Sequence, residues 1–474
     1  MLPRISKTVI AALFAFFLLK IFAVVTASPV IGYANSWDFA REEACFGIWP
    51  KYPDGRSKMD ANPAGPTNVL IRDGETNGFL CLPSADNVFG HLIGYVRPIG
   101  THVDLRVFGL MRAAVLILSV GVLLTCTVRV RNRAIIAISL LGIFGDITYL
   151  GFFNTLYSDT SVQIGAYLSA MGVFLFSSRY ERLSVRLVSV SLIGLFLLGA
   201  TKLQYAPLAF LAGLLFAGIA LFVKRSLRVA VVFLVAAIAV PLTFSMAVIN
   251  APVSSDMRRA NAIDTFMGAV LPSASDPRAA MGKIGLPEHC AHLLGKTFYD
   301  PGVAQDGTCP EILKVSRGAL LLLFVSDPNT LLQPVVAATK KLYLGMAYSD
   351  TENPDGKTGR RYRLVTLTSV STALKGLSEF AFQMLFVISA ALAACAPFLF
   401  RDRESVVLLV VGGGISIYAV LSSVFGDGLF DIQKHAALFL LGFVIQWSVL
   451  LCGFIAFAWR RREEAIEQRS VSNG

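Results

Sequence analysis

Ten long apolar runs constrain this chain more than any other feature. A helix needs about 20 mostly apolar residues to cross a bilayer. Because 55% of the 474 residues are hydrophobic and 15% are charged, against about 25% charged in a soluble domain, a soluble enzyme, a disordered chain and a coiled coil are excluded. The fold class predicted is an all-α polytopic membrane protein with about ten transmembrane helices. The runs lie near residues 8–27, 108–128, 134–153, 162–177, 187–200, 205–223, 229–250, 380–400, 406–425 and 436–458.

The net charge of +11 lies in the termini and short loops on one side of these runs. Those segments hold 17 Lys and Arg against 6 Asp and Glu, and they include the arginine-rich turns 129–133 and 179–186. Short basic loops stay in the cytoplasm, so both termini are predicted to be cytoplasmic. The charge therefore reports membrane topology, and no nucleic acid is expected as a partner.

This topology divides the chain into six parts, with two large outer loops that we name loop one (28–107) and loop two (251–379). The first helix begins with basic residues and ends in Val25-Thr26-Ala27, so a cleaved signal peptide is the alternative. Its apolar stretch is long for a signal, and retention is favoured. The parts are 1–27, the first helix; 28–107, loop one; 108–250, helices two to seven; 251–379, loop two with a small helical domain; 380–458, helices eight to ten; and 459–474, a cytoplasmic tail.

Loop two contains two apolar stretches, near 318–325 and 331–338. Pro328 separates them and Pro334 interrupts the second, and proline kinks or ends a helix. We expect two helices that lie on the membrane or pack in a small outer domain.

Four of the seven cysteines lie in the outer loops, Cys45 and Cys81 in the first, Cys290 and Cys309 in the second. An even number outside the cytoplasm indicates disulfides. Three pairings are possible, and pairing within each loop is favoured. A zinc site is the alternative, although its spacing matches no familiar finger; its ligands would be His289, Cys290, His292 and Cys309.

Three acids lie where charge is costly, at the outer ends of predicted spans. Asp38 follows the first span in an aromatic context, and such a carboxylate could be a general base, a solvated loop acid or a helix cap. Asp146 and Asp159 flank the outer ends of the third and fourth spans, and Asp159 could simply cap a helix. Glu42 and Glu43 follow Asp38 and are expected to be solvated.

Cations close two short outer turns, Lys202 with Gln204 and Lys434 with His435. The positive-inside tendency works against cations there. A phosphate at the membrane surface would explain them; anchoring, or pairing with a nearby acid such as Asp427, is the alternative. Acids and cations on one face fit an anionic, lipid-linked substrate and proton transfer.

The motif Asn35-x-x-Asp38-Phe39-x-Arg41, followed by Cys45-Phe46-Gly47-Ile48-Trp49, resembles the membrane-integral glycosyltransferases of the GT-C fold. Within that group the chain looks like the bacterial glycan-biosynthesis hexose transferases of the WsfD type. Trp37 departs from the family, which has a small residue before the acid. The other matching segments are Tyr157-Ser158-Asp159, Lys202-x-Gln204, Lys434-His435, Leu271-Pro272, Ser275-Asp276-Pro277 and Gly285-Leu286-Pro287.

The resemblance implies a GT-C-like bundle whose active site faces the exterior or periplasm at the bacterial cytoplasmic (inner) membrane. It implies transfer of a sugar, a hexose in that family, from a polyprenyl-phosphate donor to a glycan or glycolipid acceptor, with inversion. Asp38 would be the general base. Members of the GT-C group divide on metal dependence, so a divalent cation at Asp159 stays open, and no other cofactor is implied. The donor phosphate would bind Lys202, Gln204, Lys434, His435 and Arg41, and the substrate would be oriented by Asn35, Asp146 and Asp159.

Two other classes of protein share parts of this pattern. A transporter or flippase of lipid-linked sugars would use the same cations for the head group, but such proteins tend to carry internal inverted repeats, and we find none. An outer-face polysaccharide polymerase or ligase also has a large outer loop. It tends to rely on arginine and histidine in that loop, and the Asp38 motif argues against it.

Overall fold

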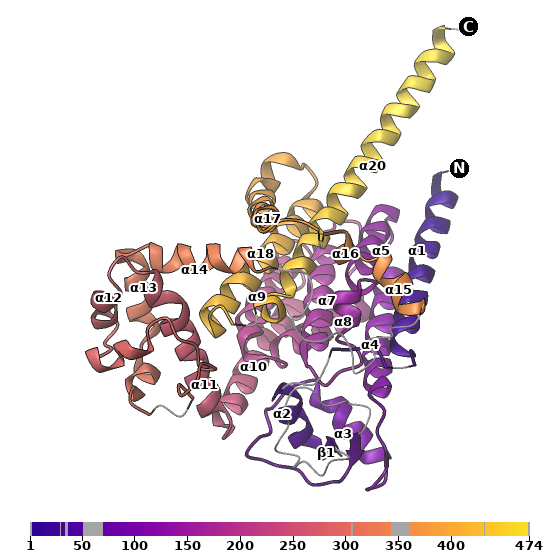
Figure 1. Ribbon diagram of the computed structural model, residues 1–474. Coiled ribbons are helices and arrows are strands. Elements are labelled where there is room, and N and C mark those ends of the chain that lie inside the picture. Colours follow the sequence, from indigo (N-terminus) through magenta and orange to yellow (C-terminus); the bar gives the residue numbers. More distant parts are fainter. Residues whose placement is uncertain are drawn as a thin grey trace.

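The computed structural model describes residues 2–28, 30–33, 37–50, 70–304, 307–342, 360–374, 376–430 and 432–472. In this part of the chain, eight helices are long and apolar enough to cross a membrane (Figure 1). The chain is an all-α polytopic membrane protein, as predicted. These helices are α1 (Leu2–Val25), α4 (Leu105–Cys126), α7 (Asp159–Ser177), α9 (Ala206–Phe222), α10 (Leu227–Asn250), α17 (Glu379–Leu399), α18 (Arg403–Asp427) and α20 (Leu438–Ser472).

The two remaining predicted spans are shorter helices of 15 residues each, α5 (Val130–Phe144) and α8 (Val185–Gly199). Fifteen residues rise about 22 Å, less than the roughly 30 Å hydrocarbon core. The predicted span 134–153 is wrong as one continuous helix, because α5 stops at Phe144. The Asp146 side chain then caps a new short helix, α6 (Ile147–Leu150), by accepting from the Thr148 N–H at 2.9 Å. A cap can break a run that stays apolar in sequence.

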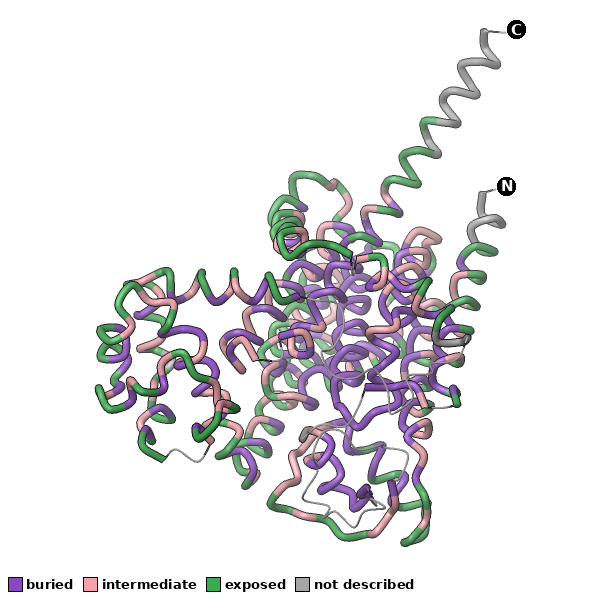
Figure 2. The backbone as a smooth tube through the Cα atoms, viewed as in Figure 1, coloured by how far each residue is buried: buried purple, intermediate pink, exposed green. Residues whose placement is uncertain are grey.

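Helix α7 is the centre of the bundle. Each of its residues is buried, and it contacts α4, α8, α9, α18 and α20 (Figure 2). Small residues let α8 approach it closely: a Cβ at Gly165 would lie 2.5 Å from the backbone nitrogen of Leu198. Close backbone approach through glycine is typical of helix packing in membranes. The first residue of α7, Asp159, is thereby fixed in place.

Loop one folds into a small unit at one end of the bundle. It contains α2 (Trp37–Phe46), α3 (Asn87–Val96), and strands β1 (Ile48–Pro50) and β2 (Leu70–Arg72), which pair antiparallel with Ile48 opposite Arg72. The Cys45–Cys81 disulfide joins α2 to the segment before α3, as predicted. This unit lies at the opposite end of the bundle from the start of α1 and the end of α20 (Figure 1).

Loop two is helical and is closed by the second predicted disulfide, Cys290–Cys309. Helices α13 (Arg317–Ser326) and α14 (Asn329–Lys340) meet at 91°, with the break next to Pro328 as predicted. Pro334 lies inside α14. The other elements are α11 (Ser254–Ala262), the π-helix η3 (Ile263–Val270), η4 (Leu271–Ser273), α12 (Pro277–Lys283), η5 (Glu288–Leu293), η6 (Pro310–Lys314), α15 (Arg360–Leu367) and α16 (Val370–Leu374).

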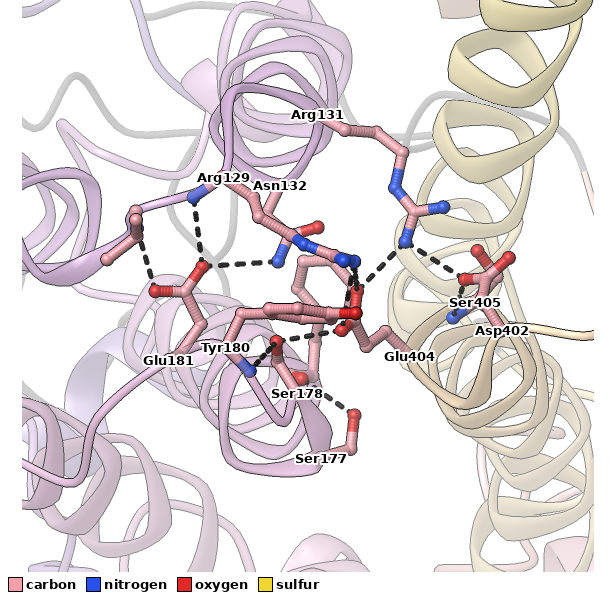
Figure 3. Close-up of polar contacts among 12 residues, drawn as sticks. Arg129, Arg131, Asn132, Ser177, Ser178, Tyr180, Glu181, Asp402, Glu404 and Ser405 are labelled. Carbon is pink, nitrogen blue, oxygen red and sulfur yellow. Dashed lines mark hydrogen bonds and ion pairs between the residues drawn. The ribbon is translucent and has the colours of Figure 1, made fainter.

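The arginine-rich turns lie at the end of the bundle opposite the loop-one unit. There the buried carboxylate of Glu404 accepts from Arg131 at 2.9 Å, from Arg129 at 3.3 Å and from the Ser178 hydroxyl at 2.8 Å (Figure 3). Glu181 accepts from the backbone N–H of Val128 at 2.7 Å. These contacts hold together the turns between α4 and α5, between α7 and α8, and between α17 and α18. We call this set of contacts the clamp.

Candidate functional site

The site is built around Asp38, in the first turn of α2. An acid there is favoured by the partial positive charge of a helix N-terminus. Its carboxylate accepts from Arg41, one turn later, at 2.8 Å, and also pairs with the Lys434 ammonium. Lys434 lies 396 residues away in sequence, in the short helix α19 (Ile432–His435) between α18 and α20. The fold therefore holds the predicted base between two of the predicted phosphate ligands.

Lys434 is almost fully buried, with 6% of its side chain exposed, whereas Asp38 is 27% exposed. Its ammonium lies 4.8 Å from the centre of the Tyr157 ring, a cation–π contact. Burial opposes the charge on Lys434, but Asp38, Tyr157 and Asp159 together outweigh it and raise the lysine pKa. Burial would likewise raise the pKa of Asp38, yet Lys434, Arg41 and Lys202 together hold it well below its usual range.

A second acid and cation pair lies beside the first. Asp159, the first residue of α7, accepts from the Lys202 ammonium with both carboxylate oxygens, at 2.7 and 2.8 Å. Lys202 lies in the tight turn between α8 and η2 (Leu203–Tyr205). Since its charge also acts on Asp38, the two pairs belong to one electrostatic site.

The third pair is His435 with Asp427, Nε2 to carboxylate at 2.8 Å. The Tyr205 hydroxyl donates to the His435 carbonyl at 2.7 Å, so the turns of Lys202 and His435 are joined although their side chains bind different acids. Gly428 shapes this turn: its φ is +64°, and a Cβ there would lie 2.1 Å from the Asp264 carbonyl oxygen of η3. We call these seven residues the ion-pair cluster: Asp38, Arg41, Lys434, Asp159, Lys202, Asp427 and His435.

A buried ion pair next to the cluster holds the segment that leads into α7. Arg112 of α4 is fully buried and binds Asp86, just before α3. The same guanidinium donates to the carbonyls of Phe153 and Thr155 at 2.9 and 2.6 Å. It thereby fixes the segment that carries Tyr157 into the start of α7.

The expectation that Glu42 and Glu43 are solvated is wrong. Both are buried, because α2 packs into the loop-one core. Burial, with the nearby Asp86 charge, raises the pKa of Glu42 well above its usual range, although Arg112 and Lys202 oppose the shift. Burial alone raises the pKa of Glu43 to about 8. Neither carboxylate oxygen of Glu43 has a hydrogen-bond partner in the described residues.

The other predicted site residues lie as follows. Asp146 is buried apart from the cluster, where its carboxylate accepts from the backbone N–H groups of Thr148 and Ser371 at 2.9 and 2.7 Å. Gln204 is next to Tyr205, and the backbone carbonyl of Gln204 accepts from the Tyr418 hydroxyl. Asn35 lies outside the described residues.

One group of metal-type ligands occurs in the described chain, His289, Cys290 and Glu311. The Cys290 sulfur forms the loop-two disulfide, so it is not available as a thiolate ligand. A divalent cation at Asp159 would have to displace the Lys202 ammonium from both carboxylate oxygens.

Two features of the site were missed from the sequence. Glu42 is four residues after Asp38 and faces the same side of α2, a spacing that could have placed it beside the site. Asp86, in contrast, carries no local signal, because its partner Arg112 is 26 residues away.

Comparison with known proteins gives one result. The sequence model of the YfdI N-terminal transmembrane domain matches residues 2–472. No curated protein and no solved structure matches the chain.

Proposed function

The chain belongs to the family of the YfdI N-terminal transmembrane domain, and from that premise and the site geometry we propose that it is a membrane glycosyltransferase. It moves a sugar, in the first instance a hexose, from a polyprenyl-phosphate donor to a glycan or glycolipid acceptor. The reaction takes place on the outer face of the bacterial cytoplasmic membrane, at the loop-one end of the bundle.

One observation carries this proposal: a partly exposed carboxylate, Asp38, is held between Arg41 and Lys434 beside a second pair, Asp159 and Lys202. Charged side chains this close to a lipid-facing bundle are costly and point to function. Cations suit a phosphate, and a carboxylate suits proton removal from a hydroxyl.

The reaction then runs as follows. The acceptor hydroxyl attacks the anomeric carbon of the donor sugar, and the bond from that carbon to the phosphate oxygen breaks. The proton of the hydroxyl passes to Asp38. Polyprenyl phosphate leaves with the electron pair, and Lys434, Arg41 and Lys202 stabilise its negative charge.

While Lys434 and Arg41 are paired with Asp38, its low pKa makes it a weak base. A bound donor phosphate competes for Lys434 and Arg41, and each cation that turns to the phosphate stabilises the Asp38 carboxylate less. The pKa of Asp38 then rises toward its ordinary value. Asp38 becomes an effective base when the donor is present.

Binding of the leaving group tests the proposal without knowledge of the sugar. Protein in lipid nanodiscs is titrated with decaprenyl phosphate, and Lys434→Met and Arg41→Met should each weaken binding about tenfold or more, since a charge-assisted contact contributes about 1.5–3 kcal/mol. Asp256→Asn is the control, because Asp256 is an exposed acid of α11 outside the cluster. Unchanged binding in both methionine variants would contradict the phosphate role.

A further inference from the structure

Gln163 stands out among the buried polar residues of α7. It is 1% exposed, and neither its amide nitrogen nor its amide oxygen has a hydrogen-bond partner among the described residues. An unpartnered buried polar group costs about 1–3 kcal/mol, so such a group in a native protein calls for an explanation.

Its polar neighbours on the helix are satisfied by the protein. Thr160 donates to the Phe152 carbonyl at 2.9 Å, and the Tyr167 hydroxyl donates to the Ile136 carbonyl at 2.8 Å. Ser161 donates to the Asp86 carboxylate. Among these neighbours the unpartnered state is therefore particular to Gln163; farther along α7 only the Ser169 hydroxyl, in the described residues, shares it.

Gln163 lies one helical turn after Asp159 of the ion-pair cluster, on the same helix. It follows Asp159 by four residues, so it shares a helix face with that carboxylate and lies about 6 Å farther along the axis. Helical side chains lean toward the N-terminus of their helix, which here means toward Asp159 and its partner Lys202.

The chemistry of the amide indicates the class of ligand. A carboxamide offers two N–H donors and one carbonyl acceptor but no charge. Each sugar hydroxyl both donates and accepts, and two neighbouring hydroxyls of a pyranose ring present one donor and one acceptor side by side. The charged residues of the cluster suit a phosphate, whereas Gln163 suits the neutral, polyhydroxylated part of the same molecule.

We propose that Gln163 is a sugar-binding residue, whose amide pairs with hydroxyls of the transferred sugar while the cluster holds the phosphate. This rests on the proposed function and deepens it, because it separates the site into an ionic part and a neutral part. Gln163 takes no part in bond breaking; it selects the sugar.

The test compares binding of two kinds of probe in nanodiscs: decaprenyl phosphate, and decaprenyl phosphate linked to glucose, mannose or galactose. Wild-type protein should bind one of the sugar-linked forms more tightly than bare decaprenyl phosphate. Gln163→Met keeps the size of the side chain and removes its hydrogen bonds. It should bind bare decaprenyl phosphate as the wild type does, lose about tenfold or more for the preferred sugar-linked form, and have an equal or higher Tm.

Ser169→Ala is the matched control. Ser169 is a buried residue of α7 whose hydroxyl also lacks a partner in the described residues, but it packs against Gly194 of α8. The Ser169→Ala variant should keep the sugar preference of the wild type. An unchanged sugar preference in Gln163→Met, or a lower Tm that marks the amide as a holder of buried water, would overturn the proposal. Failure of wild-type protein to bind even bare decaprenyl phosphate would instead overturn the proposed function on which it rests.

Discussion

At the scale of single residues, the environment of each carboxyl decides what it can do. Asp38 lies between two cations and stays ionised, whereas Glu43, five residues later, has no charged partner and a pKa of about 8. Carboxyls whose pKa values are pushed apart in this way commonly serve different purposes. Here the ionised carboxyl belongs to the cluster and the other lies in the core of loop one.

Glu43 should make the protein less stable as the pH rises. In the unfolded chain its pKa is near 4.5, and in the folded protein it is about 8. Between these values the folded state holds a proton that the unfolded state releases, so stability falls by about 1.4 kcal/mol per pH unit. Glu43→Gln remains neutral. It should match the wild type near pH 4.5 and have a clearly higher Tm at pH 8 and above.

Thermal unfolding of both proteins between pH 4.5 and 9 checks this prediction. Asp256→Asn, which changes an exposed acid, should unfold in parallel with the wild type over the same range. Parallel curves for Glu43→Gln and the wild type would show that Glu43 is ionised in the folded protein at neutral pH.

At the scale of elements, α2 and α19 bring the cluster together, and each is a short helix that depends on its surroundings. Isolated helices of this length are marginal. Helix α2 is tied down by the Cys45–Cys81 disulfide, and α19 by the bond from Tyr205 to the His435 carbonyl.

Removing the loop-one disulfide should therefore impair the site at a distance. A disulfide typically contributes about 2–4 kcal/mol. The double variant Cys45→Ser, Cys81→Ser should have a lower Tm and weaker decaprenyl phosphate binding, because α2 carries both Asp38 and Arg41. Cys395→Ser, at an exposed free cysteine, is the control. Wild-type affinity in the double variant would mean that packing alone positions α2.

The clamp at the arginine-rich end should affect stability without affecting the site. Breaking a buried ion pair by removing one partner costs up to about 3–5 kcal/mol, and the partly exposed arginines here reduce that figure. Glu404→Gln should lower Tm by several degrees and leave decaprenyl phosphate affinity within about twofold. Arg228→Gln, an exposed arginine with no ion pair in the described chain, should change neither. A large loss of affinity in Glu404→Gln would show coupling between the two ends.

At the scale of the whole molecule, the sequence predicted what hydrophobic patterning and compartment chemistry can reveal. The long apolar runs gave the all-α membrane class, and the location of the cysteines gave both disulfides. Patterning could not predict the break after Phe144, because a cap at Asp146 interrupts a run that is apolar on both sides. Nor could it reveal that Glu42 and Glu43 are buried, because both look like solvated acids in sequence.

The site was predictable as a set of residues, but its pairings were not. Charges at outer turns identified Asp38, Asp159, Lys202 and Lys434 because charge is costly there. Which cation meets which acid depends on how distant helices pack, as the contact between Lys434 and Asp38 across 396 residues shows. Gln163 carries no such signal, since a neutral amide inside an apolar run is unremarkable until its partners are known.

Sugar transfer by Asp38→Asn decides whether Asp38 is the general base. The assay supplies decaprenyl-phosphate glucose, mannose and galactose with labelled sugar, and membranes of a strain lacking the protein as the source of acceptor. We expect wild-type protein and Asp256→Asn to transfer label from one donor, and Asp38→Asn to do so about 10²–10⁴-fold more slowly. The same variant should still bind decaprenyl phosphate, since its cations remain. Near-normal transfer by Asp38→Asn would contradict the account and turn attention to Asp159.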